Sequence, residues 1–436
     1  MGISKEGAGM ADSCKCINRA PAKVKSRELF MLFSLFVVQF LGFSFLLEGL
    51  IVIFRKNGLP LEKIGFVYLL GIFMVFKFLW APFIDRVRLF KGVGHLKGWL
   101  VSIQFLLFGV LVLIGMCDVT EHITVIIALS MVVGFLAATH DVALDALVYR
   151  LVGESNRGVG NGIKIAGGMM GYMLGGGLAL VLYGLLGWSG SFIFMCTLSV
   201  LAIGQLLFFK EGEHVSYGKE KIPYHRIILR FWSGRGKMRW LRLMTIYPMG
   251  VSLSYFLIGP IMVDVGWSVE KIGFIVNVLG AAVGAATAYI CGRMINRLGR
   301  KRMLVVLAFM QSLCILMLLL PVFGYSGFWA SLAIGSMLLI YAPSSTVLST
   351  IMMDMCSEET PATDFAMQHS LTFLVGIISG IMGTILAGFF GYSLILISAS
   401  LCSLAGVYLS VRFYSAADTS DETSAAGMMA SESLNI

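Results

Sequence analysis

Glu62-Lys-Ile-Gly-Phe66 recurs, residue for residue, as Glu270-Lys-Ile-Gly-Phe274, and each copy opens a long apolar run. Where these runs end, Ile84-Asp-Arg86 has its counterpart in Ile295-Asn-Arg297. In both cases the two copies lie about half the chain length apart. One short identity can arise by chance, but matches that keep a common register indicate an internal duplication.

A third correspondence joins Asp145 to Asp354, each near the end of a later apolar run. The three matches together predict two parallel six-helix repeats, joined by the basic segment 210–241. Membrane proteins of this architecture are transporters that hold their site between the two repeats.

The composition predicts an all-α membrane protein. Of 436 residues, 58% are hydrophobic and 13% are charged, and the mean hydropathy is +0.88. A soluble domain keeps about a quarter of its residues charged. Apolar runs of about twenty residues are long enough to cross a bilayer. Twelve are predicted: 29–54, 64–84, 99–116, 123–149, 160–186, 190–209, 242–263, 272–292, 303–324, 328–352, 364–390 and 392–411.

The net charge of +9 reflects orientation in the membrane rather than nucleic-acid binding. Lys and Arg gather in the tail before the first run and in every second connection, and the remaining connections carry few. This bias is the positive-inside rule, and an even number of crossings places both termini in the cytoplasm. The predicted organisation is a basic cytoplasmic tail 1–28, a six-helix bundle 29–209, a cytoplasmic linker 210–241, a second bundle 242–413 and a disordered cytoplasmic tail 414–436.

Gly292-Arg-Met-Ile-Asn-Arg-Leu-Gly-Arg-Lys-Arg302 resembles the loop motif of the major facilitator superfamily, with Asn296 in the position of an Asp. The first-half copy, Ala81-Pro-Phe-Ile-Asp-Arg86, keeps the Asp and Arg but begins with Ala. The resemblance implies the major facilitator fold, with twelve transmembrane helices in two pseudo-symmetric bundles.

Four stretches resemble the AmpG-like (peptide–acetyl-CoA–drug transporter) branch of that superfamily. They are Lys77–Arg86, Ala138–Asp145, Arg157-Gly-Val-Gly-Asn-Gly running into Gly175-Gly-Gly177, and Thr363-Asp-Phe-Ala-Met-Gln368. The resemblance implies proton-driven import of muropeptides, acetyl-CoA or ferric siderophores through an inner (cytoplasmic) membrane. The muropeptide permeases typically have two more helices, so the shorter siderophore permeases of the RhtX/FptX type are the closest match.

One position departs from the branch, because His140 stands where its members commonly have Gln. The substrate, the coupling group and the direction of transport, import or export, therefore stay open.

Charged and histidine side chains inside the predicted spans are candidates for proton coupling or for lining a substrate cavity. Such residues are costly in lipid and usually face a cavity or a partner. The third, sixth, ninth and twelfth spans have none in their interiors, as expected of lipid-facing helices. The candidates are Glu48, Lys77, His140, Asp141, Lys164 and His369.

Asp141 is the deepest acid of the fourth span, and Lys77 stands at a similar depth in the second. The pair has two interpretations: a permanent structural ion pair, or a carboxylate that takes up and releases a proton during transport. His140 is the alternative proton carrier because imidazole titrates near neutral pH, although a lone histidine in a span more often serves packing.

A cytoplasmic gate is predicted from the superfamily resemblance. In the superfamily, the Arg of the loop motif binds an acid at the end of the fourth span. This chain would do so twice, through Arg86 with Asp145 and through Arg297 with Asp354. Asp85 is expected to cap the first turn of the eleventh span, where a helix dipole favours an acid.

Other classes of function fit the residues less well. His140 and Asp141 are adjacent on a helix and point in different directions, so they do not converge on one metal ion as a hydrolytic site requires. An intramembrane enzyme, a metal-ion transporter and a sensor without transport are therefore disfavoured. The expected partners are a small-molecule substrate such as a ferric siderophore, protons and the lipid bilayer; no cofactor is expected, and the protein is predicted to be a monomer.

Overall fold

The computed structural model describes residues 24–50, 53–54, 70–119, 121–212, 231–233, 236–325 and 327–433. Regular secondary structure in these residues is helical. The repeated segment Glu62–Phe66, the first part of the basic tail and most of the predicted linker 210–241 lie outside the described residues.

The first half of the chain builds one bundle of helices. Lys77 begins a 3-10 turn between two short helices. Two segments, Phe45–Gly49 and Met173–Leu178, are π-helical, and the long helix Ile123–Tyr172 bends at Gly153. The elements are α1 (Ser26–Ser44), η2 (Phe45–Gly49), α4 (Ile72–Phe76), η4 (Lys77–Leu79), α5 (Ala81–Arg86), α6 (His95–Met116), α7 (Ile123–Tyr172), η5 (Met173–Leu178) and α8 (Ala179–Phe208).

The second half repeats this pattern. Its elements are α10 (Lys237–Tyr255), α11 (Ile258–Asp264), α12 (Val269–Gly273), η6 (Phe274–Leu279), α13 (Gly280–Leu298), α14 (Arg300–Met317), α15 (Leu319–Val322), α16 (Phe328–Asp354), α17 (Pro361–Phe390) and α18 (Tyr392–Ser433).

The helices account for the predicted crossings. Nine helical stretches of the described chain are long and apolar enough to span a membrane. One of them, Ile123–Phe208, has 86 residues and bends sharply at Gly153 (φ 58°) and Gly187 (φ 71°). Positive φ is readily available only to glycine, so these positions permit reversals of the chain. Three crossings in this stretch, together with the partly described second span, agree with twelve crossings.

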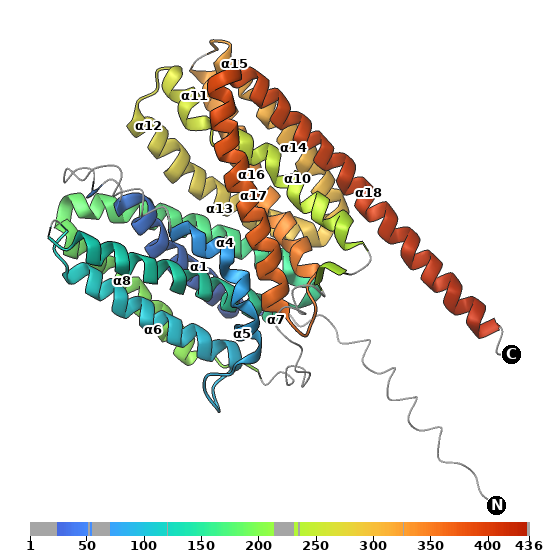
Figure 1. The fold of residues 1–436 in the computed structure, drawn as a ribbon, viewed down its shortest axis with the longest axis horizontal. Helices are drawn as coiled ribbons and strands as arrows, with labels where there is room; N and C mark the ends of the chain where they lie inside the picture. Colours follow the sequence, from blue (N-terminus) through green and yellow to red (C-terminus); the bar gives the residue numbers. More distant parts are fainter. Residues whose placement is uncertain are drawn as a thin grey trace, which may run out of the picture.

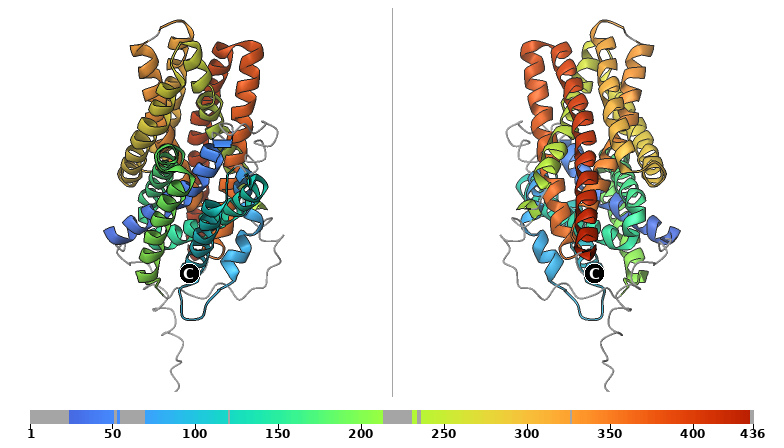
Figure 2. Two further views of the ribbon diagram at one scale, coloured as in Figure 1. Left: turned by 90° about the vertical axis from the view of Figure 1, so that its left-hand side faces the viewer. Right: turned by 90° about the vertical axis from the view of Figure 1, so that its right-hand side faces the viewer.

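The two halves form separate bundles whose axes are inclined to each other (Figure 1). Figure 2 shows the same division from both sides. The principal contacts between the bundles join α7 to α13, α16 and α17. α6, α8, α14 and α18 make their principal contacts within their own bundle, as expected for the charge-free third, sixth, ninth and twelfth spans.

The bundles pack most closely where α7 crosses α13. A β-carbon on Gly158 would stand 2.6 Å from the carbonyl oxygen of Gly292, and one on Gly162 would stand 2.7 Å from that of Ala288. Such distances are shorter than van der Waals contact, so only glycine allows the backbones to approach this closely. An apolar cluster continues from one bundle to the other at the same level, and includes Ile84, Val148, Ile295 and Met353.

The end of the chain differs from the prediction. Disorder is expected from residue 414, whereas α18 continues as a helix to Ser433. Ala, Met and Glu, which are frequent in this segment, favour helix. Extending an existing helix also avoids the cost of nucleating a new one.

Candidate functional site

Four charged side chains meet inside the first bundle, beside the interface with the second. Lys77, Asp141, Asp145 and Lys164 have exposed fractions of 0%, 1%, 2% and 2%. Asp141 and Asp145 are one helical turn apart on α7 and therefore share a face. The bend at Gly153 turns α7 back on itself, which brings Lys164 to the same place.

Each charge has an opposite partner. Lys77 donates to Asp141 Oδ2, as the sequence analysis proposed. Lys164 Nζ lies 2.6 Å from both carboxylate oxygens of Asp145 and 3.8 Å from Asp141 Oδ1. We call these four residues the charge tetrad. Two carboxylates and two ammonium groups balance in formal charge, which offsets the large cost of burying any one of them alone.

Gln39 of α1 connects the tetrad to His140. Its Nε2 donates to Asp141 Oδ1 at 2.8 Å, and its Oε1 lies 3.2 Å from His140 Nδ1. His140 Nε2 is buried and has no hydrogen-bond partner among the described residues. Gln39 is not among the predicted site residues, because a neutral amide carries no charge that marks it; a polar amide within an otherwise apolar span was the available signal.

The second bundle covers the tetrad through α17. Lys164 Nζ lies 4.7 Å from the centroid of the Phe365 ring, within the range of a cation–π interaction. His369 stacks between Phe365 and Phe373, with interplanar angles of 26° and 14°. His369 is also within electrostatic range of Lys77, Lys164 and Asp141. The tetrad is therefore sensitive to any movement of α17 against α7.

Asp85 caps α17 across the bundle interface. Its carboxylate accepts hydrogen bonds from the backbone N–H of Ala362 (3.2 Å) and of Thr363 (2.9 Å), and from the Thr363 hydroxyl (2.6 Å). The predicted contact between Asp85 and the start of the eleventh span is confirmed.

Asp354 forms a second link between the bundles. Arg157 of the first bundle donates to Asp354 Oδ1 at 3.0 Å. Arg300 of the second bundle donates to both oxygens, at 2.7 and 3.2 Å, and also to the backbone carbonyl of Glu154 at 2.9 Å. We call Arg157, Asp354 and Arg300 the latch, because they join α7 to α16 and α14.

The predicted gate pairs need correction. Asp145 binds Lys164 rather than Arg86, because the fold-back of α7 places Lys164 beside it. Asp354 binds Arg157 and Arg300 rather than Arg297, which lies on an exposed face of α13. The repeat-related acids thus have unlike partners: one belongs to the buried tetrad and the other to the latch.

Glu48 lies away from the tetrad, in the π-helical turn η2 that continues α1. It is exposed, and it is within electrostatic range of Tyr172 of its own bundle and Tyr255 of the other. The six coupling candidates therefore do not form one site: Lys77, His140, Asp141, Lys164 and His369 gather at the tetrad, and Glu48 stands apart.

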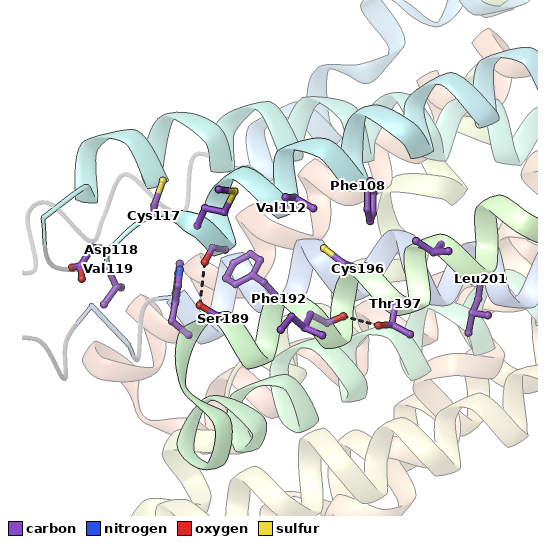
Figure 3. A pocket seen from close by; sticks show the side chains of 15 residues that line it. Phe108, Val112, Cys117, Asp118, Val119, Ser189, Phe192, Cys196, Thr197 and Leu201 are labelled. Carbon is purple, nitrogen blue, oxygen red and sulfur yellow. Dashed lines mark hydrogen bonds between the residues drawn. The ribbon is translucent and has the colours of Figure 1, made fainter.

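A pocket of about 790 Å³ lies between α6 and α8, and none of these charged residues lines it (Figure 3). Its walls are mostly apolar side chains such as Phe108, Val112, Phe192 and Leu201. Since α6 and α8 lie on the outside of their bundle, the pocket faces the lipid and does not form part of the candidate site. The described part of the chain holds no group of three or more His, Cys, Asp or Glu side chains suited to a metal ion.

Comparison with known proteins agrees with this architecture. The profile of the Major Facilitator Superfamily matches residues 29–380 and 243–431. The chain belongs to this superfamily. Solved structures of other superfamily members share the fold: the human organic anion transporter MFSD10 (TM-score 0.68, 14% identity, 88% of this chain and 99% of that one) and the Escherichia coli fucose:proton symporter FucP (TM-score 0.68, 11% identity, 89% and 99%).

Within the superfamily, the chain resembles AmpG-type proteins. It is 27% identical to the anhydromuropeptide permease of Escherichia coli K12 over 335 residues, which are 72% of this chain and 65% of the permease. It is 22% identical to the putative transporter AmpG 4 of Rickettsia conorii, over 89% of this chain and 98% of that protein. The predicted branch is therefore supported, and the name of the Escherichia coli relative refers to muropeptides.

Loss of the latch is expected to slow transport by this superfamily member. Replacing Asp354 with Asn leaves Arg157 and Arg300 without their shared carboxylate, so the bundles should spend less time in this arrangement. We expect a several-fold fall in transport rate with normal membrane insertion. Uptake rates and spin-label distances between α7 and α16 would measure this.

The matched control is Asp264→Asn. Asp264 is an exposed acid that accepts a hydrogen bond from the Tyr392 hydroxyl within the second bundle. An Asp354→Asn protein with the rate and distance distribution of the Asp264→Asn protein would show that the latch has no part in the cycle.

Proposed function

We propose that this protein is a proton-coupled secondary transporter that imports a muropeptide-type solute by alternating access. The observation that carries the proposal is the charge tetrad, which lies within one bundle and is covered by α17 of the other. When the bundles rock, the cover moves and the environment of the carboxylates changes. A change from dry to wet surroundings shifts the balance between a protonated and a charged carboxyl group.

Asp141 is the proposed proton carrier, and its neighbours give it two alternative states. Lys77 and Gln39 hold the charged carboxylate, and Lys164 is close enough to exchange between Asp145 and Asp141. If Lys164 moves fully to Asp145, or if Lys77 withdraws, the charged form of Asp141 loses stabilisation and takes up a proton. His140 is connected to Asp141 by two hydrogen bonds through Gln39, so a change of charge at Asp141 also affects His140.

The substrate assignment rests on similarity to the anhydromuropeptide permease. Ferric siderophores, which the sequence analysis favoured, are the competing substrate class. Uptake into proteoliposomes under an imposed pH gradient separates the two. We expect accumulation of a radiolabelled anhydromuropeptide that collapses when a protonophore is added. Accumulation of a ferric siderophore with no response to anhydromuropeptide would reject the proposed substrate.

The proposed location is the inner membrane, with both termini and the linker 210–241 in the cytoplasm. The positive-inside bias of the connections supports this orientation. In a background in which the 8 cysteines are replaced, Ser216→Cys in the linker should resist an impermeant thiol reagent added to intact cells. Ser268→Cys, in the connection before α12, is the control and should react quickly. The reverse pattern would invert the proposed topology.

A further inference from the structure

Glu48 is a carboxylate inside a span with no hydrogen-bond or ion-pair partner in the part of the chain that the structure describes. The other charged side chains in the span interiors pair with one another: Lys77, Asp141, Asp145 and Lys164. An isolated charge within a bilayer costs several kcal/mol on most scales, so such residues generally have a partner. The described residues thus leave the Glu48 carboxylate available to a charged group of a bound solute.

Glu48 faces the space between the bundles rather than the lipid. Its side chain is exposed, yet it lies within electrostatic range of Tyr255, which belongs to the second bundle. On the near side it stands against η5, where a β-carbon on Gly176 would be only 2.6 Å from Glu48 Oε2. Glycine at this position thus leaves room for the carboxylate between η2 and η5.

One tyrosine from each bundle, Tyr172 and Tyr255, lies within electrostatic range of this carboxylate, and a third, Tyr341, stacks on Tyr255. Tyr172 at the end of α7 is within electrostatic range of Glu48, Tyr255 and Tyr341. Tyr255 of α10 and Tyr341 of α16 are stacked, with ring centroids 4.7 Å apart and an interplanar angle of 26°. Tyr172 packs against Phe40 at 5.6 Å. All three tyrosines are half-buried, so each ring keeps an accessible part.

The backbone at this level is irregular in a way that is common at functional sites. η2, η5 and η6 are all π-helical, and η5 contacts both of the others. π-Helical turns are rare and are frequently found at functional sites. Here one of them carries Glu48 and another directly follows Tyr172.

We propose that Glu48, Tyr172, Tyr255 and Tyr341 form the binding site for an ammonium group of the transported solute. A carboxylate supplies the counter-charge, and aromatic faces attract cations and exclude water. The inference rests on the proposed function and specifies the substrate as an amine-bearing one. Because the tyrosines come from both bundles, a bound ammonium group stabilises the arrangement in which the bundles approach each other here.

The test compares two forms of one ligand, an anhydromuropeptide with a free amine on its peptide and the same compound with that amine acetylated. Wild-type protein in nanodiscs should bind the free amine about tenfold more tightly, equivalent to one good charge interaction. Glu48→Gln should bind both forms equally. Tyr172→Phe, which keeps the ring, should retain the preference, and Tyr172→Ala should lose most of it. Glu121→Gln, an exposed acid in the connection after α6, is the control and should match wild type.

Equal binding of the two forms by wild-type protein, or an undiminished preference in Glu48→Gln, would overturn the inference while leaving muropeptide transport intact. Binding of neither form would reject the substrate class of the proposed function instead. The ammonium site is then tested by carbodiimide labelling of Glu48, followed by mass spectrometry. Tetramethylammonium chloride should slow labelling several-fold relative to sodium chloride, and equal rates would overturn the inference.

Discussion

Lys164→Met is expected to lower the yield of folded protein severely. Asp145 would lose the ammonium group that lies 2.6 Å from both of its oxygens, in a place where its exposed fraction is 2%. Breaking a buried ion pair by removing one partner typically costs about 3 to 5 kcal/mol, because the other charge stays buried and uncompensated. Yield after membrane extraction and the thermal unfolding midpoint in detergent would measure the loss.

A double variant separates charge from shape. Lys164→Met combined with Asp145→Asn removes both charges, so the unfolding midpoint should recover much of the way towards wild type. Lys271→Met, at an exposed lysine of α12, should change the midpoint little. A single Lys164→Met protein as stable as wild type, or a double variant no better than the single one, would contradict the charge balance assigned to the tetrad.

Asp141→Asn is expected to abolish uphill transport while sparing binding. The amide resembles the protonated carboxyl group and cannot release a proton, so the cycle should lose its driving force. We expect at least a tenfold fall in pH-driven accumulation, with counterflow exchange of solute still measurable. The two activities would be measured in the same proteoliposome preparation.

Lys77 provides the matched comparison. Asp141→Asn leaves the buried Lys77 ammonium group without its carboxylate, so some loss of stability is also expected. The double variant Lys77→Met with Asp141→Asn removes that penalty but leaves no proton carrier. It should be more stable than the single variant and equally unable to accumulate solute. Recovery of accumulation in the double variant would show that the pair is structural and that coupling belongs to His140 or Glu48.

The sequence predicted the fold well because its signals are local and strong. Apolar length, charge bias between connections and the internal repeat each indicate two six-helix bundles. The Lys77–Asp141 pair was also predictable, since both residues stand at similar depth on neighbouring spans. The cap by Asp85 was predictable because the dipole of a helix favours an acid at its first turn.

The partners of Asp145 and Asp354 could not be predicted in the same way. Lys164 reaches Asp145 only because α7 bends at Gly153. Which residues then face each other across the bend depends on how its two helical parts pack, and this cannot be read from the sequence. Arg157 meets Asp354 across the bundle interface, where residues far apart in sequence become neighbours. Gln39 was missed because a neutral amide gives a weak signal until its contacts with Asp141 and His140 are seen.

Proton flux across the membrane shows whether the tetrad moves protons together with solute. A pH-sensitive dye inside proteoliposomes would record internal acidification when an anhydromuropeptide is added outside. Wild-type protein should acidify the interior in proportion to solute uptake, and Asp141→Asn should exchange solute without acidification. Asp141→Asn protein that carries protons and solute in the wild-type ratio would contradict the assignment of Asp141 as the proton carrier.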